Sequence, residues 1–430
     1  MRLSIVKGEG LKKAVARLEG RAGTAQEDAR QRVLEILAEV REKGDAALLA
    51  YTERFDGAKL QSLRVSEAEI AEAYAIVGEK AAAILKRSAK NIRAFHEQQK
   101  QASFMNFGDE IKLGQIVRPL ASAGIYVPGG RAAYPSSVLM NAIPASVAGV
   151  ERIVMVTPPG KDGKVTPMTL VAASVAGVKE IYKVGGAQAV AALAYGTESV
   201  PAVDKIVGPG NLYVALAKRE VFGQVGIDMI AGPSEILVVA DGSANPEYVA
   251  ADLLSQAEHD PLAAAILLTD DAGLAERVLA EVERQTAAAP RREIIERSLE
   301  DFGILGVVDS LTAAVDQANA IAPEHLELAV ADPFALLGRV KNAGSIFLGH
   351  YAPEPLGDYF AGPNHVLPTN GTARFSSPLG VYDFVKRSSV IHYTKEALQK
   401  AGQDIVDFAG LEGLFAHGQA VSVRMKEDER

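Results

Sequence analysis

Hydrophobic and polar positions follow two patterns along this chain, and the pattern changes near residue 110. Residues 25–104 place Ala, Leu and charged side chains at helical spacing, as in AQEDARQRVLEILAEVREK, which predicts a mostly helical opening. Beyond residue 110, short β-branched runs that end in glycine alternate with alanine-rich helical patterns. This alternation predicts parallel strands with helices on both faces of the sheet.

The predicted strands fall into two sets. The first set has the strand ends IYVPGG, RIVMVTPPG, EIYKVGG and DKIVGPG, and the second comprises SEILVVAD, AAAILLTDD, GILGVVDS and GSIFLGH. The repeat ASVAGV, at 145–150 and 173–178, marks a helix end, a glycine cap and a strand start in two successive units. We predict an α/β fold with two Rossmann-like, doubly wound parallel-sheet domains and small helical N- and C-terminal appendages.

Composition narrows the class of protein. A chain of 430 residues is too long for one core, and its net charge of −9 argues against a nucleic-acid partner, which needs a basic surface. The start lacks a secretory signal pattern, and the uncharged run 132–150 contains prolines and serines that a bilayer tolerates poorly. We expect a cytoplasmic protein that binds a small molecule and contacts no membrane.

Three strand ends of the first set carry side chains that can bind a ligand, namely Tyr126, Gln188 and Asn211. Ligands of open α/β sheets lie beyond the carboxyl ends of the strands, and glycine lets the backbone approach them closely. The alternative is that these glycine-rich turns merely connect parallel strands. Neither G-x-G-x-x-G nor G-x-x-x-x-G-K-[ST] is present, so the loops alone do not predict a nucleotide.

Further polar groups have spacings that suit a metal or a substrate. Gln256 and His259 are three residues apart at a helix end and project from one face, so they can bind one divalent metal. The alternative is that a histidine at the end of a helix interacts only with the helix dipole. Asp358 and His365 lie in a Gly/Pro/Asn-rich loop that presents side chains rather than packing them. Glu412 and His417 are five residues apart and converge on a ligand if Gly413 interrupts the helix.

Glu324 and His325 are adjacent in APEHLEL, where we expect a short helix or turn after Pro323. A glutamate in a first helical turn can simply complement the helix dipole. An acid/base pair that shares a cleft with a metal can instead remove a hydroxyl proton and activate water.

Seven motifs together resemble the histidinol dehydrogenase family, over nearly the whole chain from about residue 25. They are QAEHD, APEHLEL, GDYFAGPNHVLPT, LEGLFAHG, AGPSE, GIYVPGG and VGGAQAVAALAYGT. The resemblance implies oxidation of L-histidinol to L-histidine through bound L-histidinaldehyde, with two NAD⁺, water and one zinc ion per active site; the sequence does not distinguish zinc from manganese.

The resemblance also implies the roles of individual residues. The zinc ligands would be Gln256, His259, Asp358 and His417. The substrate contacts would be Ser234, Gln256, His259, His325, Asp358, His365, Glu412 and His417. Tyr126, Gln188 and Asn211 would hold NAD.

The catalytic residues implied by the resemblance are His325, which removes the alcohol proton, and Glu324, which activates water for attack on the aldehyde. Many aldehyde oxidations proceed through a cysteine thiohemiacetal. The chain contains no cysteine, so an activated water must be the nucleophile.

The family likeness further implies a homodimer, in which Glu412 and His417 come from the neighbouring subunit. We expect four parts of the chain. An N-terminal arm spans 1–24, and a discontinuous first α/β domain, which holds the metal and the catalytic pair, spans 25–109 and 233–376. A second α/β domain on the NAD side spans 110–232, and a C-terminal helical tail that reaches the partner spans 377–430.

Two alternatives come from other classes of protein. One is a zinc hydrolase of small polar amides, and the other is a non-catalytic two-domain binding protein.

Overall fold

The computed structural model describes residues 3–19, 26–129 and 134–426. The chain divides into two compact units, the first with residues 1–99 and 120–384 and the second with residues 100–119 and 385–430. Some parts of the expectations above lie outside the described residues. They are residues 1–2 and 20–24 of the N-terminal arm, residue 25 of the first expected domain, Gly130 of GIYVPGG, residues 132–133 of the uncharged run, and residues 427–430 of the tail.

A five-stranded parallel sheet in the first unit has the order β6-β5-β4-β7-β8. Its strands are β4 (Ser122–Tyr126), β5 (Arg152–Thr157), β6 (Glu180–Lys183), β7 (Lys205–Val207) and β8 (Gly226–Ile227). The winding reverses between β4 and β7, so this sheet is doubly wound as predicted. The first set of predicted strands is confirmed.

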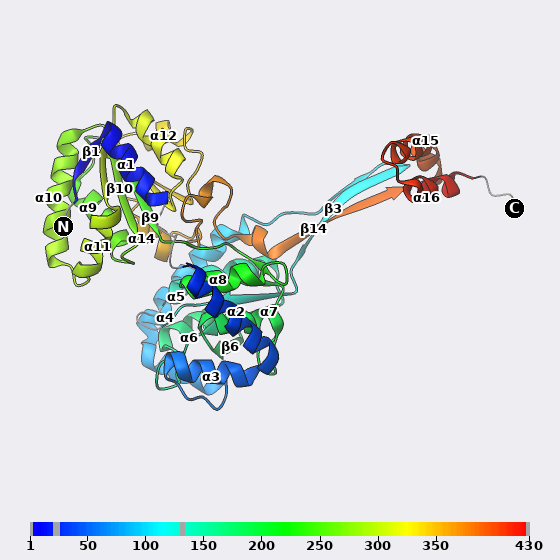
Figure 1. Cartoon of the computed structure of the whole chain (residues 1–430), viewed down its shortest axis with the longest axis horizontal. Coiled ribbons are helices and arrows are strands. Elements are labelled where there is room, and N and C mark those ends of the chain that lie inside the picture. The colour runs from blue at the N-terminus through cyan, green and yellow to red at the C-terminus, as the bar shows by residue number, and fades with distance from the viewer. Residues whose placement is uncertain (1–2, 20–25, 130–133, 427–430) are drawn as a thin grey trace. The chain divides into compact units, whose positions relative to one another are not determined.

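Helices cover both faces of this sheet (Figure 1). They are α2 (Gln26–Lys43), α3 (Asp45–Asp56), α4 (Glu67–Glu97), α5 (Pro135–Ala148), α6 (Pro167–Ala176), α7 (Gly186–Tyr195) and α8 (Leu212–Val221). The repeated ASVAGV segments end α5 and α6, where Gly149 and Gly177 adopt φ of 92° and 84°. At both ends the following valine amide bonds back to the alanine carbonyl five residues earlier, as in a Schellman cap.

The opening helices pack differently from the grouping expected above. We expected residues 25–109 to join 233–376, but α2 and α3 share a hydrophobic core with α7 and α8, and α4 shares one with α5 and α6. The reason is the apolar face of each helix: Val33 and Leu48, for example, are buried in the same cluster as Leu193. These helices therefore belong with the five-stranded sheet.

A six-stranded parallel sheet, also in the first unit, has the order β1-β11-β10-β9-β12-β13. Its strands are β1 (Ile5–Lys7), β9 (Glu235–Ala240), β10 (Ala264–Thr269), β11 (Ile304–Val307), β12 (His325–Ala329) and β13 (Ser345–Leu348). All four strands of the second predicted set are confirmed. The part of the expected N-terminal arm that is described contributes β1 to the edge of this sheet.

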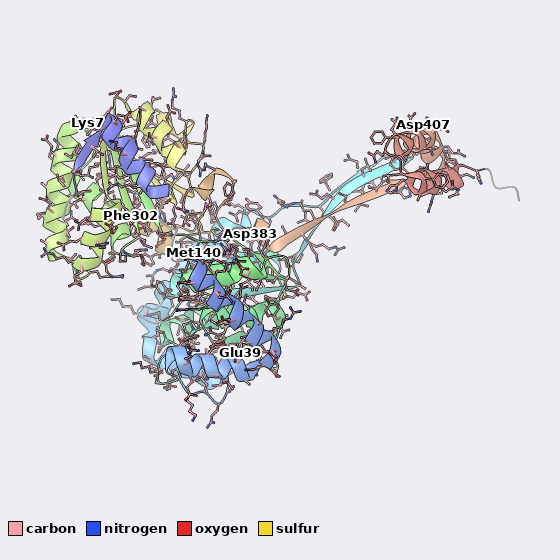
Figure 2. The ribbon with its side chains drawn as sticks, viewed as in Figure 1. Lys7, Glu39, Met140, Phe302, Asp383 and Asp407 are labelled. Carbon is pink, nitrogen blue, oxygen red and sulfur yellow. The ribbon has the colours of Figure 1, made fainter. Side chains whose placement is uncertain are left out.

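The helices that accompany this sheet are α1 (Gly8–Glu19), α9 (Pro246–Ala257), α10 (Ala272–Ala288), α11 (Arg292–Phe302), α12 (Leu311–Ile321), α13 (Pro333–Leu337) and α14 (Glu354–Tyr359). The first unit ends with the 3₁₀ turns η1 (Thr372–Arg374) and η2 (Val381–Phe384). Figure 2 draws the side chains on both sheets, with Phe302 labelled on α11 and Met140 on α5. Strands β9 and β10 are buried along their whole length, which fits their near-continuous apolar sequences.

The second unit combines an antiparallel sheet with a helix pair. Its elements are β2 (Phe104–Phe107), β3 (Ile111–Pro119), β14 (Val385–Tyr393), α15 (Lys395–Leu411) and α16 (Phe415–Met425). Strand β14 pairs with β3 over nine residues, so the expected helical tail contains a strand before its two helices. Its first residues, 377–384, belong to the first unit. Among all described residues, no helix has the length and apolar character needed to cross a membrane.

Asp56 provides a pH-dependent test of the packing of α3. It ends this helix, and its Oδ2 atom is buried without a hydrogen-bond partner among the described residues. Burial raises the pKa of Asp56 to about 6 from 3.8. Because the folded state then holds the proton more tightly than the unfolded chain does, Asp56 destabilises the fold increasingly as the pH rises from 3.8 to about 6.

We expect Asp56→Asn to increase the free energy of unfolding by about 1 kcal/mol at about pH 8, allowing for partial solvent access, and by less at about pH 5. Urea unfolding at both pH values measures the difference. Asp45→Asn is the control at the other end of α3, where the carboxylate accepts hydrogen bonds from Thr197 and Ser199; this change should not stabilise. A gain for Asp56→Asn that is larger at acid pH would contradict the assignment.

Candidate active site

Glu324 and His325 lie at the amino end of β12, in the first unit. His325 is the first residue of this buried strand, opposite Ile236 of the neighbouring β9, so the expectation of a short helix or turn is wrong for His325. The apolar residues that follow His325 extend into the sheet core, which favours a strand over a helix. Both side chains are almost completely excluded from solvent.

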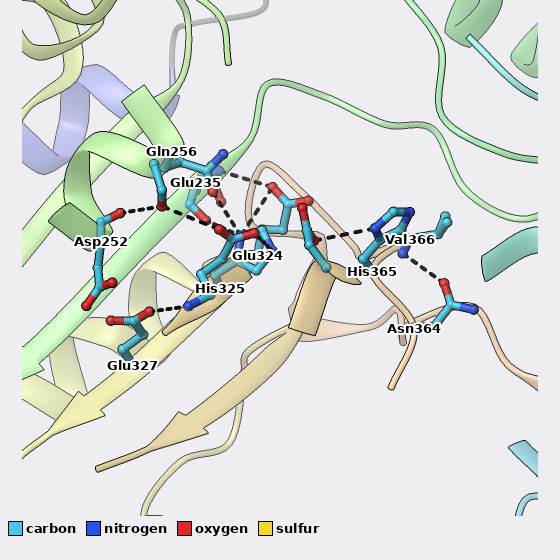
Figure 3. A network of polar contacts seen from close by, with 12 residues as sticks. Glu235, Asp252, Gln256, Glu324, His325, Glu327, Asn364, His365 and Val366 are labelled. Atoms are coloured by element: carbon cyan, nitrogen blue, oxygen red, sulfur yellow. Dashed lines mark hydrogen bonds and ion pairs between the residues drawn. The ribbon is translucent and has the colours of Figure 1, made fainter. Parts of the chain in front are cut away.

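Hydrogen bonds fix the ring of His325 (Figure 3). Its Nδ1 lies 3.1 Å from the carbonyl oxygen of Glu235 and 2.9 Å from Oε1 of Gln256. A backbone carbonyl can only accept, so Nδ1 must carry the hydrogen. The lone pair then resides on Nε2, which lies 3.6 Å from Oε1 of Glu354.

Burial sets the protonation of both members of the pair. It lowers the pKa of His325 to about 4, against the opposing influence of the Asp358 charge, so the imidazole is neutral and able to accept a proton. Burial also raises the pKa of Glu324 well above its usual range. The backbone amide of Glu235 donates to Oε2 of Glu324 at 3.1 Å, and a hydrogen bond with Ser234 also favours its ionised form. Glu324 is therefore a strong base once it is ionised.

Helix α9 brings Gln256 to this pair. The helix begins at Pro246 behind the Asn245 cap and runs back across the sheet, so its carboxyl end meets the amino ends of β9 and β12. Gln256 is buried, whereas His259, just beyond the helix, is exposed. His259 is close enough for its charge to influence His325 and Asp358.

Asp358 and His365 lie close together, although Asp358 is on helix α14 and not in the loop that the sequence predicts. Oδ1 of Asp358 lies 3.4 Å from Nδ1 of His365. Burial alone would raise the pKa of Asp358, but His365 lowers it below the usual value. The loop is anchored beside them by Asn364, whose side chain donates to the carbonyl of Met140 and accepts from the amide of Val366.

Glu354 is a site residue that the sequence reasoning missed. It is buried, its Oε1 has no hydrogen-bond partner among the described residues, and its pKa is raised to about 8 by burial and by Asp358. The signal was its spacing: Glu354 and Asp358 are four apart on α14 and therefore share one helix face.

A second layer of carboxyl groups lies behind Glu354. Oε1 of Glu327 accepts from the Glu354 amide at 2.8 Å, and Glu327 in turn interacts with Asp252. Burial raises the pKa of Glu327 well above its usual value and that of Asp252 to about 6. The sequence contains a signal for both residues. Glu327 is two strand positions after His325, and Asp252 is one helical turn before Gln256, so each shares a face with a candidate site residue.

The residues present fit a divalent metal. Ligand atoms of His325, Glu354 and Asp358 all lie within 4.8 Å of one another, and Gln256 contacts the same histidine. Oε1 of Glu354 is buried without a hydrogen-bond partner among the described residues, an arrangement that favours a cation at this place. Oxygen and imidazole donors of this kind are those that zinc and manganese accept.

The three candidate NAD residues lie at or beyond the carboxyl ends of strands in the five-stranded sheet. Tyr126 ends β4, Gln188 is on α7 and Asn211 caps α8, so all follow the carboxyl ends of strands. Tyr126 and the loop after β7 flank the point where the winding reverses, which is where such sheets bind ligands. The hydroxyl of Tyr126 accepts from the amide of Gly186 at 3.1 Å, and burial raises its pKa to about 12.

Glu412 and His417 belong to the second unit. Glu412 is the C-cap of α15, His417 is on α16, and both are exposed. Gly413 between them has φ of 72° and ends the first helix, which is the interruption that convergence of the two side chains requires.

The geometry defines an α/β enzyme. A neutral histidine and a basic carboxyl, both desolvated, lie beside oxygen and nitrogen ligands at the edge of a doubly wound sheet.

Comparison with known proteins identifies the family. The family model for histidinol dehydrogenase matches residues 19–425. Histidinol dehydrogenase of Geobacillus kaustophilus is 59% identical over 404 residues, covering 94% of this chain and 95% of the relative.

Two further relatives agree. Histidinol dehydrogenase of Bacillus subtilis is 57% identical, with 94% of each chain covered. The crystal structure of histidinol dehydrogenase from Elizabethkingia anophelis superposes with a TM-score of 0.93 at 40% identity, with 98% of each chain covered. The chain belongs to the histidinol dehydrogenase family and is an NAD-dependent oxidoreductase of histidine biosynthesis, as the sequence motifs predicted.

Proposed function

We propose that this chain is a zinc-dependent L-histidinol dehydrogenase that catalyses the last step of histidine biosynthesis. The reaction is a four-electron oxidation of L-histidinol to L-histidine through bound L-histidinaldehyde, with two NAD⁺ and one water consumed. The observation that carries the proposal is the desolvated Glu324–His325 pair beside the carboxyl groups of Glu354 and Asp358, in a chain that has no cysteine nucleophile.

The proposed metal ligands are Gln256, His259 and Asp358 of one chain and His417 of the partner subunit. When bound, zinc would orient the amino alcohol by accepting its imidazole and amino nitrogens. The proposed substrate contacts are Ser234, Gln256, His259, His325, Asp358, His365, Glu412 and His417. Glu354 is close enough to Asp358 and His325 to hold both in place.

His325 acts as the base of the first oxidation. Its Nε2 takes the proton of the substrate hydroxyl while hydride leaves the same carbon for the first NAD⁺, which yields the aldehyde. The bond from Nδ1 to the Glu235 carbonyl holds the ring in the required tautomer. That bond also stabilises the imidazolium that forms.

Glu324 acts in the second oxidation. Its carboxylate removes a proton from water, and the resulting hydroxide adds to the aldehyde carbon to give the monoanion of the hydrate. His325, after releasing its first proton to solvent, takes the remaining hydroxyl proton of this anion as the second hydride leaves for the second NAD⁺, which yields the carboxylate product. Burial supports this role, because a carboxyl with a raised pKa is the better base.

Tyr126, Gln188 and Asn211 are the proposed NAD contacts. Their support is the switch point between β4 and β7 and the close backbone packing of the glycine turns. For example, a Cβ on Gly185 would lie 2.6 Å from the Pro158 side chain, so the loops pack at a distance that only glycine allows.

We further propose a homodimer whose second unit completes the site of the partner. Support comes from the second unit itself, which exposes large apolar side chains on its strands and on both helices. These are Phe104, Phe107, Ile391, Phe408, Leu411 and Phe415. An apolar surface of this kind is typical of a protein interface, and it adjoins the proposed site residues Glu412 and His417.

The alternative class, a zinc hydrolase of small polar amides, also needs a metal, a carboxylate and water. A hydrolase does not require a second set of ligand-binding side chains at the switch point of another sheet. Membership of the dehydrogenase family favours the oxidoreductase.

The function has a direct assay. We expect purified protein with zinc to reduce NAD⁺ when L-histidinol is added, with two NADH formed per histidine and none with amide substrates. Removal of the metal by a chelator should abolish NADH formation, measured by its absorbance, and added zinc should restore it. Metal analysis should show that Asp358→Asn lowers the bound zinc; NADH formation that survives complete metal removal would contradict the proposed zinc role.

The division of labour predicts an unequal effect of Glu324→Gln. Removal of a general base slows its own step by about 10²-fold or more. Oxidation of histidinaldehyde should slow by this factor, whereas oxidation of histidinol to the aldehyde should change little. His325→Gln is the matched control and should slow both half-reactions; equal losses for Glu324→Gln would refute the proposed roles.

The shared site predicts complementation between inactive chains. His259→Ala and His417→Ala should each be inactive alone, but co-expression should restore up to about a quarter of the wild-type activity, because half of the dimers then contain one intact site. Differently tagged chains allow the mixed dimer to be isolated. An isolated mixed dimer without activity would show that both residues act within one chain.

A further inference from the structure

A buried ion pair lies beneath one of the proposed NAD loops. Lys218 is on α8, and Asp228 directly follows β8 on the neighbouring segment. Nζ of Lys218 contacts Oδ1 of Asp228, and the two side chains are only 3% and 1% exposed. Charges buried to this degree stabilise a fold poorly compared with apolar side chains of the same size, so the pair calls for another reason.

Both members of the pair also hold the backbone of Gly208. Nζ of Lys218 donates to the Gly208 carbonyl at 2.9 Å, and the Gly208 amide donates to Oδ2 of Asp228 at 2.8 Å. The two backbone groups of one residue are thus held by opposite charges. Hydrogen bonds to buried charged groups are among the strongest in proteins.

Gly208 occupies a position that no other residue can take. Its φ is +114°, and a Cβ at this place would lie 2.2 Å from the carbonyl oxygen of Tyr126. The loop after β7 is therefore pressed against the last residue of β4, across the point where the winding reverses.

From Gly208, the chain and the contacts of Tyr126 lead to the segments that carry the three proposed NAD side chains. Asn211 follows three residues later and caps α8 by accepting from the amides of Tyr213 and Val214. Tyr126 touches Gly208 through its backbone, and its hydroxyl binds the amide of Gly186, two residues before Gln188.

We propose that Lys218 and Asp228 are positioning residues for NAD, which hold the loop 208–211 against Tyr126 so that the cofactor-binding side chains are preformed. Neither residue needs to contact the cofactor. This inference rests on the proposed placement of NAD at these strand ends. Preformed loops bind a ligand more tightly because they lose less conformational freedom when it binds.

The test measures NADH affinity directly, by fluorescence titration of the full-length protein, and uses variants that leave no charge unpaired. Lys218→Met combined with Asp228→Leu removes both bonds to Gly208. Lys218→Met combined with Asp228→Asn keeps an acceptor for the Gly208 amide. We expect the NADH dissociation constant to rise by about tenfold or more in the first and by less in the second.

The matched control is the bidentate pair of Arg152 and Glu180, which lies at the opposite, amino edge of the same sheet. Arg152→Met with Glu180→Leu should leave NADH affinity unchanged. The KM for histidinol should not change in any of these variants. A purely structural role of Lys218 and Asp228 would lower the melting temperature without altering the affinity of the folded protein.

Asn211→Ala separates failure of this inference from failure of the proposed cofactor site. If Asn211→Ala weakens NADH binding and neither Lys218/Asp228 variant does, the positioning role is overturned and the cofactor site stands. If none of the three variants changes NADH affinity, the proposed cofactor site fails together with the inference. If the Met/Leu variant does not fold, the Met/Asn variant decides, and wild-type NADH affinity there overturns the inference.

Discussion

The exclusion of water from Glu324 and His325 is the constraint on which the rest of the site depends. Burial disfavours charge on both groups, so it leaves a neutral imidazole with a free lone pair and a carboxyl that is a strong base when ionised. Such a pair survives in a core only if each polar atom has a partner. Gln256 and the backbone of Glu235 supply such contacts, and Oε1 of Glu354 lies 3.6 Å from Nε2 of His325.

The two parallel sheets offer opposite edges to ligands. In the five-stranded sheet, the proposed NAD side chains follow the carboxyl ends of the strands on both sides of the reversal between β4 and β7, as in other open sheets. In the six-stranded sheet, the reversal lies between β9 and β12, but Glu235 and His325 are at the amino ends of these strands. The carboxyl end of α9 returns to that edge and brings Gln256 with it. The proposed catalytic pair thereby gains a buried partner that a strand-end rule does not predict.

Local patterns in the sequence predicted most of the elements but not all of their partners. The glycine-ended strands and the ASVAGV caps have strong local signals, and they form as predicted. The helices from residue 26 onward were assigned to the wrong sheet, because the spacing of apolar residues identifies the buried face of a helix but not the sheet that buries it. Glu354 and Glu327 were missed although their spacings from Asp358 and His325 were visible. Carboxyl groups are ordinarily exposed, and only the fold reveals that these are buried.

The most direct test of the active-site assignment is a crystal structure of the protein with zinc and L-histidinol bound. The proposed chemistry predicts one ion held by Gln256, His259 and Asp358 together with His417 of a second chain, and the hydroxyl-bearing carbon of the substrate facing Glu324 and Nε2 of His325. An ion bound without Asp358, or a substrate whose alcohol points away from the buried pair, would contradict it.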